Sequence, residues 1–163
     1  MNRVKSAVVV LELSAGLLIG LGINGNSAEA KTSGITPTAI RGTFYRYAGS
    51  HQWDKLQITT HTATISGRNY GKGFKITSTS KSSSHRLAYE YGSTYQGRKY
   101  FMLQAKLKNV AASAFPEEGM SLTKRKIGHH TYKVIRGYQG GYGFDFIKGH
   151  KVSKDYTHRA DNY

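Results

Sequence analysis

Short apolar segments with a two-residue repeat, separated by glycines, constrain the fold of this chain more than any other feature of its sequence. Phe101, Leu103 and Ala105 alternate with polar residues in one segment, and Phe144 and Phe146 do so in another. Because alternate residues of a strand point to the same face of a sheet, each segment is expected to be a strand with one buried face. The chain has 19 glycines, and turn residues recurring about every 8 to 12 positions are typical of an antiparallel meander, sandwich or barrel.

This pattern predicts eight strands, at residues 42–48, 55–60, 62–66, 73–79, 86–91, 99–107, 131–138 and 142–147, with a short last strand around Val152. Glycine-containing turns at 95–100 and 138–144 predict two hairpins. We therefore expect an all-β fold, a single antiparallel β-barrel of about eight strands, which would leave no exposed sheet edge. A two-sheet β-sandwich is the alternative.

The segment 111–123 interrupts the strand pattern. Pro116 is followed by Glu117 and Glu118. Proline fits the first turn of a helix, and acidic residues are favourable near the positive end of the helix dipole. The sequence thus predicts one short helix at 116–120.

The first 30 residues have the features of a secretory signal peptide. Arg3 and Lys5 precede a mostly apolar run at 7–23, and small residues lead up to Ala30. A charged start, an apolar core and an alanine-rich end are the pattern of a cleaved signal. A retained membrane helix is the alternative, although the run is short of the roughly 20 residues that a bilayer span needs.

Cleavage after Ala30 would leave a short flexible leader at 31–37 and a single all-β domain at 38–163. No later segment is apolar enough to span a membrane, so no transmembrane segment is expected after signal cleavage. The expected location is secreted, either extracellular or loosely associated with the cell surface.

The chain has no cysteine. This excludes disulfide bonds, thiol chemistry and thiolate metal ligands. A secreted domain without disulfides must be held together by its core, and a chain of this length is long enough to bury one.

Positive charge is the strongest signal in the composition. The chain has 24 Lys and Arg against 9 Asp and Glu, a net charge of +15. Removing residues 1–30 leaves this charge unchanged, because they hold two basic and two acidic residues. The excess is larger than a small domain usually carries for solubility, and it would attract polyanions. A basic surface that serves only solubility is the alternative.

The aromatic residues accompany this charge. The chain has 12 Tyr, and tyrosine suits stacking against sugars or contact with lipid headgroups. Most of these rings are expected to pack in the core, so only a minority can belong to a site. The candidate polyanion-binding residues are Arg41, Arg46, Lys124, Arg125, Lys126, Lys133 and Arg136, and the candidate aromatic contacts are Tyr45, Tyr47 and Tyr138.

The sequence contains no recognisable catalytic or metal-binding constellation. His129 and His130 are adjacent, and neighbouring strand residues point to opposite faces, so these two could not share a metal. Asp54 and Asp145 each follow an aromatic residue and are expected to pair with nearby Lys or Arg. No G-x-S-x-G elbow is present. We expect no metal, no cofactor and no enzymatic activity.

The segment from Pro37 to Tyr45 contains Arg-Gly-Thr-Phe-Tyr. It resembles the opening of small secreted proteins of lactobacilli that carry an R-G-T-W/F-Y segment. It is also similar to the G-x-W start of lipocalin-like, calycin-type β-barrels, with Gly42 and Phe44 at those positions and Phe in place of the usual Trp. The resemblance covers mainly residues 36–66 and implies secretion and a β-barrel fold.

These observations predict a secreted basic binding protein that associates electrostatically with anionic cell-envelope polymers or surfaces. The partners expected are a teichoic acid-like polymer, anionic lipid or an acidic glycan, and no native nucleic acid because the protein is exported. The lipocalin resemblance implies an alternative, a carrier of a small apolar ligand in a barrel cavity. An envelope-acting hydrolase is a third possibility.

Overall fold

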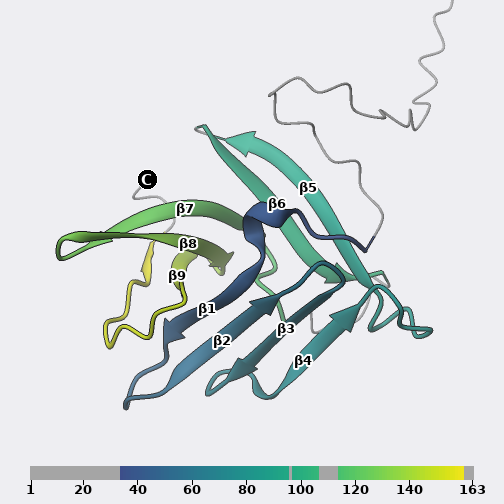
Figure 1. Cartoon of the computed structure of the whole chain (residues 1–163), viewed down its shortest axis with the longest axis horizontal. Coiled ribbons are helices and arrows are strands. Elements are labelled where there is room, and N and C mark those ends of the chain that lie inside the picture. The colour runs from purple at the N-terminus through teal and green to yellow at the C-terminus, as the bar shows by residue number, and fades with distance from the viewer. Residues whose placement is uncertain (1–33, 96, 107–113, 160–163) are drawn as a thin grey trace, which may run out of the picture.

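The computed structural model describes residues 34–95, 97–106 and 114–159. The described chain is all-β, and its antiparallel strands curl into a half-barrel (Figure 1). Along the sheet the strand order is β4-β3-β2-β1-β9-β8-β7-β6-β5, with β10 paired to β9. The elements are η1 (Thr38–Ile40), β1 (Gly42–Tyr47), β2 (Trp53–Ile58), β3 (Thr62–Gly67), β4 (Gly71–Thr77), β5 (Leu87–Tyr95), β6 (Arg98–Ala105), β7 (Met120–Ile127), β8 (His130–Gln139), β9 (Tyr142–Lys148) and β10 (His158–Arg159).

The two ends of this sheet meet at one point and do not form a continuous ladder. Thr77 at the end of β4 forms an isolated bridge with Arg86, just before β5, and its backbone N–H donates to the His85 carbonyl at 2.8 Å. The predicted all-β antiparallel fold is therefore confirmed, with a barrel that is partly open. The described strands belong to one sheet, so the alternative of two packed sheets does not apply to them.

The core lies on the concave face of the half-barrel. Phe44 and Leu56 face each other across β1 and β2, and both are completely buried. The alternation seen in the sequence places every second side chain of these strands on this face. The other large side chains that pack here include Ile58, Ile65, Ile76, Phe101, Leu103, Phe115, Met120, Ile135, Phe144 and Phe146.

The predicted helix at 116–120 was wrong. Residues 116–119 form a turn in which the Gly119 N–H donates to the Pro116 carbonyl at 3.1 Å, with Gly119 at a φ of 93°. Strand β7 begins directly afterwards at Met120, whose side chain is fully buried in the core. The pairing of β7 with β8 and the burial of Met120 outweigh the local helix signals of the proline and the two acids.

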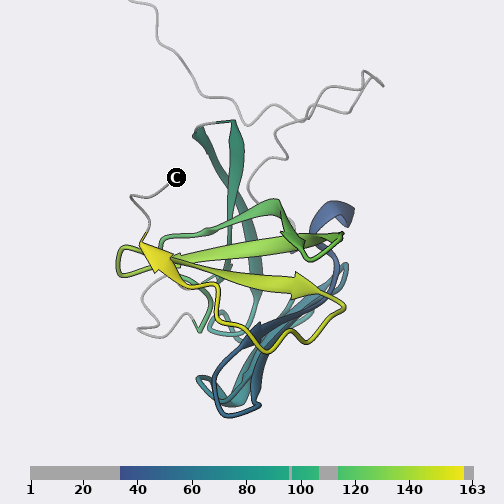
Figure 2. The same ribbon diagram turned by 90° about the vertical axis from the view of Figure 1, so that its left-hand side faces the viewer.

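The predicted last strand around Val152 was also wrong, because the final strand is β10 at 158–159. Val152 instead lies in the connection that follows β9, where its carbonyl accepts a hydrogen bond from Trp53 Nε1 at 3.3 Å. This connection runs back alongside β9 before it reaches β10 (Figure 2). It thereby covers part of the convex face of the sheet.

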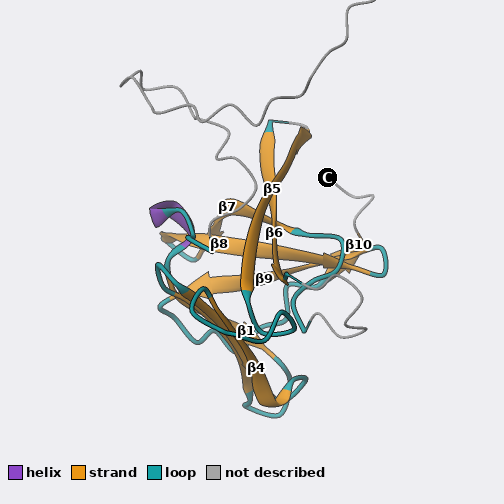
Figure 3. Cartoon of the chain, turned by 90° about the vertical axis from the view of Figure 1, so that its right-hand side faces the viewer, coloured by secondary structure: helices purple, strands orange, loops and turns teal. Residues whose placement is uncertain are grey.

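Both predicted hairpins are present. The β8–β9 turn has Gly140 and Gly141 at φ values of 60° and 75°, the left-handed conformation that a tight two-residue hairpin requires. The β5–β6 hairpin turns at Gly97. Figure 3 shows this hairpin crossing the direction of β8 and β9.

Part of the expected leader packs against the sheet. Residues 31–33 lie outside the described residues, as do the proposed signal at 1–30 and residues 107–113. Thr36 is completely buried, and its hydroxyl donates to the Thr59 carbonyl at 2.6 Å. Its backbone N–H donates to the Thr60 carbonyl at 3.0 Å, which fixes the entry into η1.

Candidate functional site

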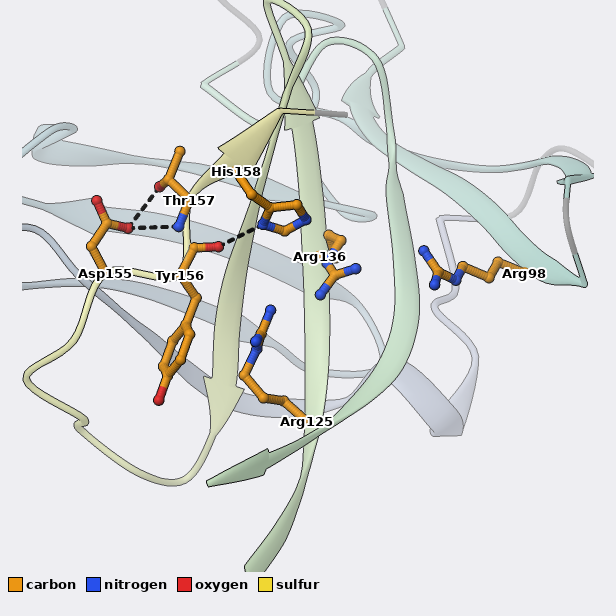
Figure 4. A pocket seen from close by; sticks show the side chains of 7 residues that line it. All are labelled: Arg98, Arg125, Arg136, Asp155, Tyr156, Thr157 and His158. Atoms are coloured by element: carbon orange, nitrogen blue, oxygen red, sulfur yellow. Dashed lines mark hydrogen bonds between the residues drawn. The ribbon is translucent and has the colours of Figure 1, made fainter. Parts of the chain in front are cut away.

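A pocket of about 530 Å³ lies between the convex face of the sheet and the C-terminal segment (Figure 4). We call it the arginine pocket, because arginines from three strands line it. Its lining residues are Arg98, Arg125, Arg136, Asp155, Tyr156, Thr157 and His158.

Strand register brings the three arginines to one face. Arg136 on β8 pairs with Ser121 on β7, and Ser121 in turn pairs with Tyr100 on β6. Arg125 lies four residues after Ser121, and Arg98 lies two residues before Tyr100. Because even spacings along a strand keep side chains on the same face, all three arginines project from the convex face.

Asp145 on β9 holds two of these arginines. It pairs with Arg136 across the strands, and Arg136 binds it in a bidentate manner, with Nε to Oδ1 at 2.6 Å and Nη2 to Oδ2 at 3.1 Å. Arg125 Nε binds Oδ2 of the same carboxylate. The Asp145 side chain is fully buried. One carboxylate thus interacts with two guanidinium groups, and the predicted pairing of Asp145 with basic residues is confirmed.

The C-terminal segment forms the opposite wall. The Arg125 guanidinium lies 4.4 Å from the centre of the Tyr156 ring, a cation–π contact that orients both side chains. Asp155 accepts hydrogen bonds from the Thr157 N–H at 2.9 Å and from its hydroxyl at 2.7 Å. His158 Nδ1 lies 2.8 Å from the Tyr156 carbonyl. Since a carbonyl can only accept, Nδ1 carries a hydrogen in this contact.

A second basic feature lies at the edge of the concave face. Lys124 on β7 is directly opposite Lys133 on β8. The ladder between β8 and β9 ends at the pair of Val134 and Ile147, and Lys133 and Lys148 are the next residues of the two strands beyond it. Lys148 is opposite Phe44 on β1, and its Nζ lies 5.7 Å from the Phe44 ring centre. We call Lys124, Lys126, Lys133 and Lys148 the basic rim.

The basic rim places like charges next to one another. Side chains directly opposite in neighbouring strands have Cβ atoms about 5 Å apart, and like charges there are destabilising. Within the described residues, no rim lysine forms an ion pair with an acidic side chain. The rim therefore concentrates positive charge that the described part of the protein does not neutralise.

Edge protection explains only part of this arrangement. Among the described residues, β6 pairs with β7 only at Met120 and Ser121, so the rest of β7 is an open edge. Lysines on such an edge discourage unwanted strand pairing. Lys133 and Lys148, however, lie on β8 and β9, which have strand partners on both sides. Protection of an open edge therefore does not explain the lysines at positions 133 and 148.

The structure separates the predicted site residues into several places. Lys124, Lys126 and Lys133 lie in the basic rim, whereas Arg125 and Arg136 lie in the arginine pocket on the opposite face. The Lys-Arg-Lys run at 124–126 therefore places its two lysines on the concave face and its arginine on the convex face, because neighbouring strand residues alternate.

Arg41 and the candidate aromatic residues lie outside both features. Arg41 donates from Nε to the Thr36 carbonyl at 3.0 Å, which ties η1 to the leader. Tyr45 lies under Lys151, with Nζ 5.5 Å from its ring centre, and Tyr47 packs edge-on against Trp53 at 5.8 Å. Tyr138 is buried, and its hydroxyl lies 2.9 Å from Ser121 Oγ.

Arg46 faces the concave interior. Its guanidinium carbon lies 4.1 Å from the centre of the Phe144 ring, and its neighbour across β2 is the fully buried Asp54. Asp54 accepts hydrogen bonds from Asn69, from the backbone N–H at 3.0 Å and from Nδ2 at 2.6 Å. The side chain of Tyr70 packs against this end of the core.

Burial raises the pKa of the Tyr70 hydroxyl above its ordinary value of 10.0, and Asp54 raises it further, while the positive charge of Arg46 opposes both. Tyr70 in the unfolded chain therefore ionises first as the pH rises. The contribution of Tyr70 to the free energy of unfolding is therefore fully present below about pH 10. It is lost as the pH rises from there toward the higher pKa of the folded state.

Substitution of Tyr70 by Phe is expected to remove this decrease in stability at high pH, because phenylalanine cannot ionise. Urea unfolding of the wild type and Tyr70→Phe, measured at several pH values from about 8 to 11, gives the comparison. The difference in unfolding free energy between the two proteins is expected to be constant below about pH 9 to 10 and to shift in favour of the variant above it. Parallel curves over the whole range would contradict this assignment.

Sequence reasoning missed Arg98, Lys148, Tyr156 and His158. The register of β6 and β9 places Arg98 and Lys148 near the predicted residues, and the C-terminal segment brings Tyr156 and His158 to the pocket. The spacing of Lys148 after Phe144 and Phe146, two residues at a time, was the one available signal that it shares their face.

Neither a metal centre nor a spanning helix is found in the part of the chain that the structure describes. No group of three or more His, Cys, Asp or Glu in these residues could hold a metal ion. No helix among them has the length and apolar character needed to cross a membrane.

Comparison of the chain with protein-family models, with curated proteins and with solved structures gave no match in any of the three cases. The fold itself, an all-strand half-barrel, is compatible with a calycin-like β-barrel.

Proposed function

We propose that this protein is a secreted basic binding protein that associates electrostatically with an anionic cell-envelope polymer or surface. The observation that carries the proposal is the basic rim, in which Lys124 and Lys133 are directly opposite on β7 and β8 and Lys148 lies on the next strand, β9. Adjacent strands lie about 4.8 Å apart, so the rim presents positive charges from three neighbouring strands to a chain of negative groups.

The distribution of charge supports a polymer as the partner. The arginine pocket lies on the convex face and the basic rim on the concave face, on the two sides of β7. With a net charge of +15, the whole chain attracts polyanions over a long range. A flexible polymer that crosses the open edge of β7 could contact both features, whereas a small anion could contact only one.

Secretion and the family resemblance belong to the same proposal. The half-barrel is compatible with the calycin-like barrel that the segment at Gly42 and Phe44 resembles, and Phe44 is completely buried in the core on the concave face. The signal-like segment at 1–30 and the similarity to small secreted proteins of lactobacilli support export to the cell surface, where teichoic acid-like polymers, anionic lipid and acidic glycans are the abundant polyanions.

The carrier alternative requires space on the concave face. There the side chains of Phe44, Leu56 and Phe146 are each 0% exposed. A ligand in this position would have to displace well-packed core side chains, at a cost of a few kcal/mol for each one. We therefore favour binding by the charged surface.

Removal of the rim charges tests this function. Lys124→Gln, Lys133→Gln and Lys148→Gln combined in one protein are expected to weaken binding to purified bacterial cell walls about 100-fold at low salt, since each lysine near an anionic surface contributes about 1 kcal/mol. Cosedimentation with the walls over a range of protein concentrations measures the affinity.

A matched variant controls for net charge. Lys72, Lys75 and Lys99 are exposed and lie on β4 and β6, away from the rim. Their combined replacement by Gln lowers the net charge equally and is expected to weaken binding by less than about fivefold, through long-range attraction alone. Equal losses in the two triple variants would show that the rim has no special role.

A further inference from the structure

We propose that the arginine pocket is a subsite for a single phosphodiester group, so that the polymer bound by this protein is a phosphate polymer and not a carboxylate one. This inference rests on the proposed association with an anionic envelope polymer and specifies its chemical class. It depends on the arginine pocket, whereas the proposed function depends on the basic rim.

The pocket is rich in positively charged groups. Arg98, Arg125 and Arg136 contribute three guanidinium groups, and Asp145 and Asp155 contribute two carboxylates. A phosphodiester carries one negative charge at neutral pH, so it is attracted to such a group of arginines.

The contacts of Asp145 show how the arginines of the pocket bind a planar carboxylate. Its two oxygens lie against the edges of Arg125 and Arg136, and the bidentate contact with Arg136 uses Nε and one Nη2 hydrogen. A guanidinium has five N–H donors in a fixed plane, so one arginine can bind Asp145 and a second anion at the same time. The built-in carboxylate therefore orients the arginines toward a further oxyanion.

The geometry favours a tetrahedral oxyanion. Arg98, Arg125 and Arg136 come from β6, β7 and β8 and reach the pocket from different directions (Figure 4). A carboxylate presents two oxygens in one plane and is satisfied by one or two guanidinium edges, as Asp145 is. A phosphodiester also has two charged oxygens, but they lie on a tetrahedral phosphorus and accept hydrogen bonds from directions around each P–O axis, so its donors need not share one plane.

The size and walls of the pocket fit a phosphate within a polymer. A volume of about 530 Å³ exceeds what one oxyanion needs and leaves room for the polyol or sugar units on either side. The Tyr156 ring holds two cations at the mouth of the pocket, Arg125 at 4.4 Å and Lys154 Nζ at 5.5 Å from the ring centre. Arg125 also lies between Lys124 and Lys126 in sequence, so a polymer leaving the pocket over the open edge of β7 arrives at the basic rim.

Two soluble probes with equal numbers of charges test the inference. They are a short glycerol-phosphate oligomer, which has phosphodiester groups, and an oligogalacturonate, which has carboxylates. The phosphate oligomer is expected to bind wild-type protein at least about fivefold more tightly by calorimetry, with the difference due to the added charge-assisted hydrogen bonds in the pocket. Equal affinities would overturn the proposal.

Substitutions of the pocket arginines test whether the preference for the phosphate oligomer arises in the arginine pocket. Arg98→Gln is expected to weaken binding of the glycerol-phosphate oligomer about tenfold and that of the oligogalacturonate less than about threefold. Arg125→Lys keeps the charge but loses the guanidinium fork, and it is expected to reduce the same preference. Lys99→Gln, an exposed neighbour of Arg98 on β6, is the control and should leave the preference unchanged.

An NMR titration of the wild type does not depend on how the variants fold. The Nε–H signals of Arg98, Arg125 and Arg136 are expected to shift with the glycerol-phosphate oligomer, with small shifts for the oligogalacturonate. Unchanged arginine signals at saturation would overturn the pocket assignment. Shifts with a single-stranded oligonucleotide but none with the glycerol-phosphate oligomer would also overturn it, because the phosphodiester would then come from nucleic acid.

The failures of the two proposals can be told apart. A wild-type protein that binds cell walls and both oligomers equally, with loss only in the rim variant, would overturn the phosphodiester pocket and leave the proposed function in place. A protein that binds neither the walls nor the oligomers would overturn both.

Discussion

Replacement of Asp145 by Ala is expected to destabilise the protein by about 3–5 kcal/mol, because it leaves two arginines without the buried carboxylate that they share. The Asp145 side chain is 0% exposed, and that of Arg136 is only 9% exposed, so water cannot readily replace the lost interaction. Arg125, with 25% exposure, can turn toward solvent more easily. Urea unfolding followed by tryptophan fluorescence at Trp53 measures the change.

Asp155 supplies the control for this prediction. It lines the same pocket but is exposed, and its contacts are with Thr157 in its own loop. Asp155→Ala is expected to cost less than about 1 kcal/mol. An Asp145→Ala protein with stability within about 1 kcal/mol of the wild type would mean that the arginines find other partners and that Asp145 does not organise the pocket.

Replacement of Gly67 by Ala is also expected to have a large effect. It should lower the free energy of unfolding by about 3 kcal/mol or more. Gly67 ends β3 at a φ of 130°, a conformation that other residues rarely adopt. A Cβ at this position would lie 2.6 Å from both the Asp54 Cα and the Trp53 carbonyl oxygen. Because both are backbone atoms of β2, relief of the clash requires the hairpin to move away from the strand.

That movement would also disturb Asp54. The turn after Gly67 carries Asn69, whose backbone and side chain donate to the buried Asp54 carboxylate. Gly71 in the same turn has a φ of 56°, and beyond its chain neighbours no atom lies within 4 Å of the place that a Cβ would occupy, so Gly71→Ala adds backbone strain without a clash. It is expected to cost only about 1–2 kcal/mol. Equal losses for the two substitutions, measured by thermal or urea unfolding, would show that contact with β2 is unimportant.

The strands and the core could be predicted from the sequence because they depend on a local repeat. The alternation around Phe101 and Phe144 identifies a strand and its buried face without knowledge of its partners. Strand β7 was missed because Pro116 and Glu117 look like a helix start, while Leu122 is followed closely by three basic residues that give no apolar alternation. Its strand conformation comes from pairing with β8, which local sequence does not encode.

The site could be predicted only in part for the same reason. Basic composition identified Arg125, Arg136, Lys124 and Lys133 as candidates, but it treated them as one set. Their division between two faces follows from alternation along β7 and β8, and the addition of Arg98 and Lys148 follows from the register of β6 and β9. Arg46, placed among aromatic residues in the sequence, instead faces the interior over Phe144.

The salt dependence of binding to purified cell walls tests the central claim most directly. If the basic rim holds an anionic polymer, affinity should fall steeply with salt, and the logarithm of the binding constant should decrease linearly with the logarithm of salt concentration. Loss of Lys124, Lys133 and Lys148 is expected to make the slope shallower by about 2, if each lysine neutralises one charge as on a single-stranded polyanion. Wild-type binding that is undiminished at high salt, or absent at low salt, would contradict the account.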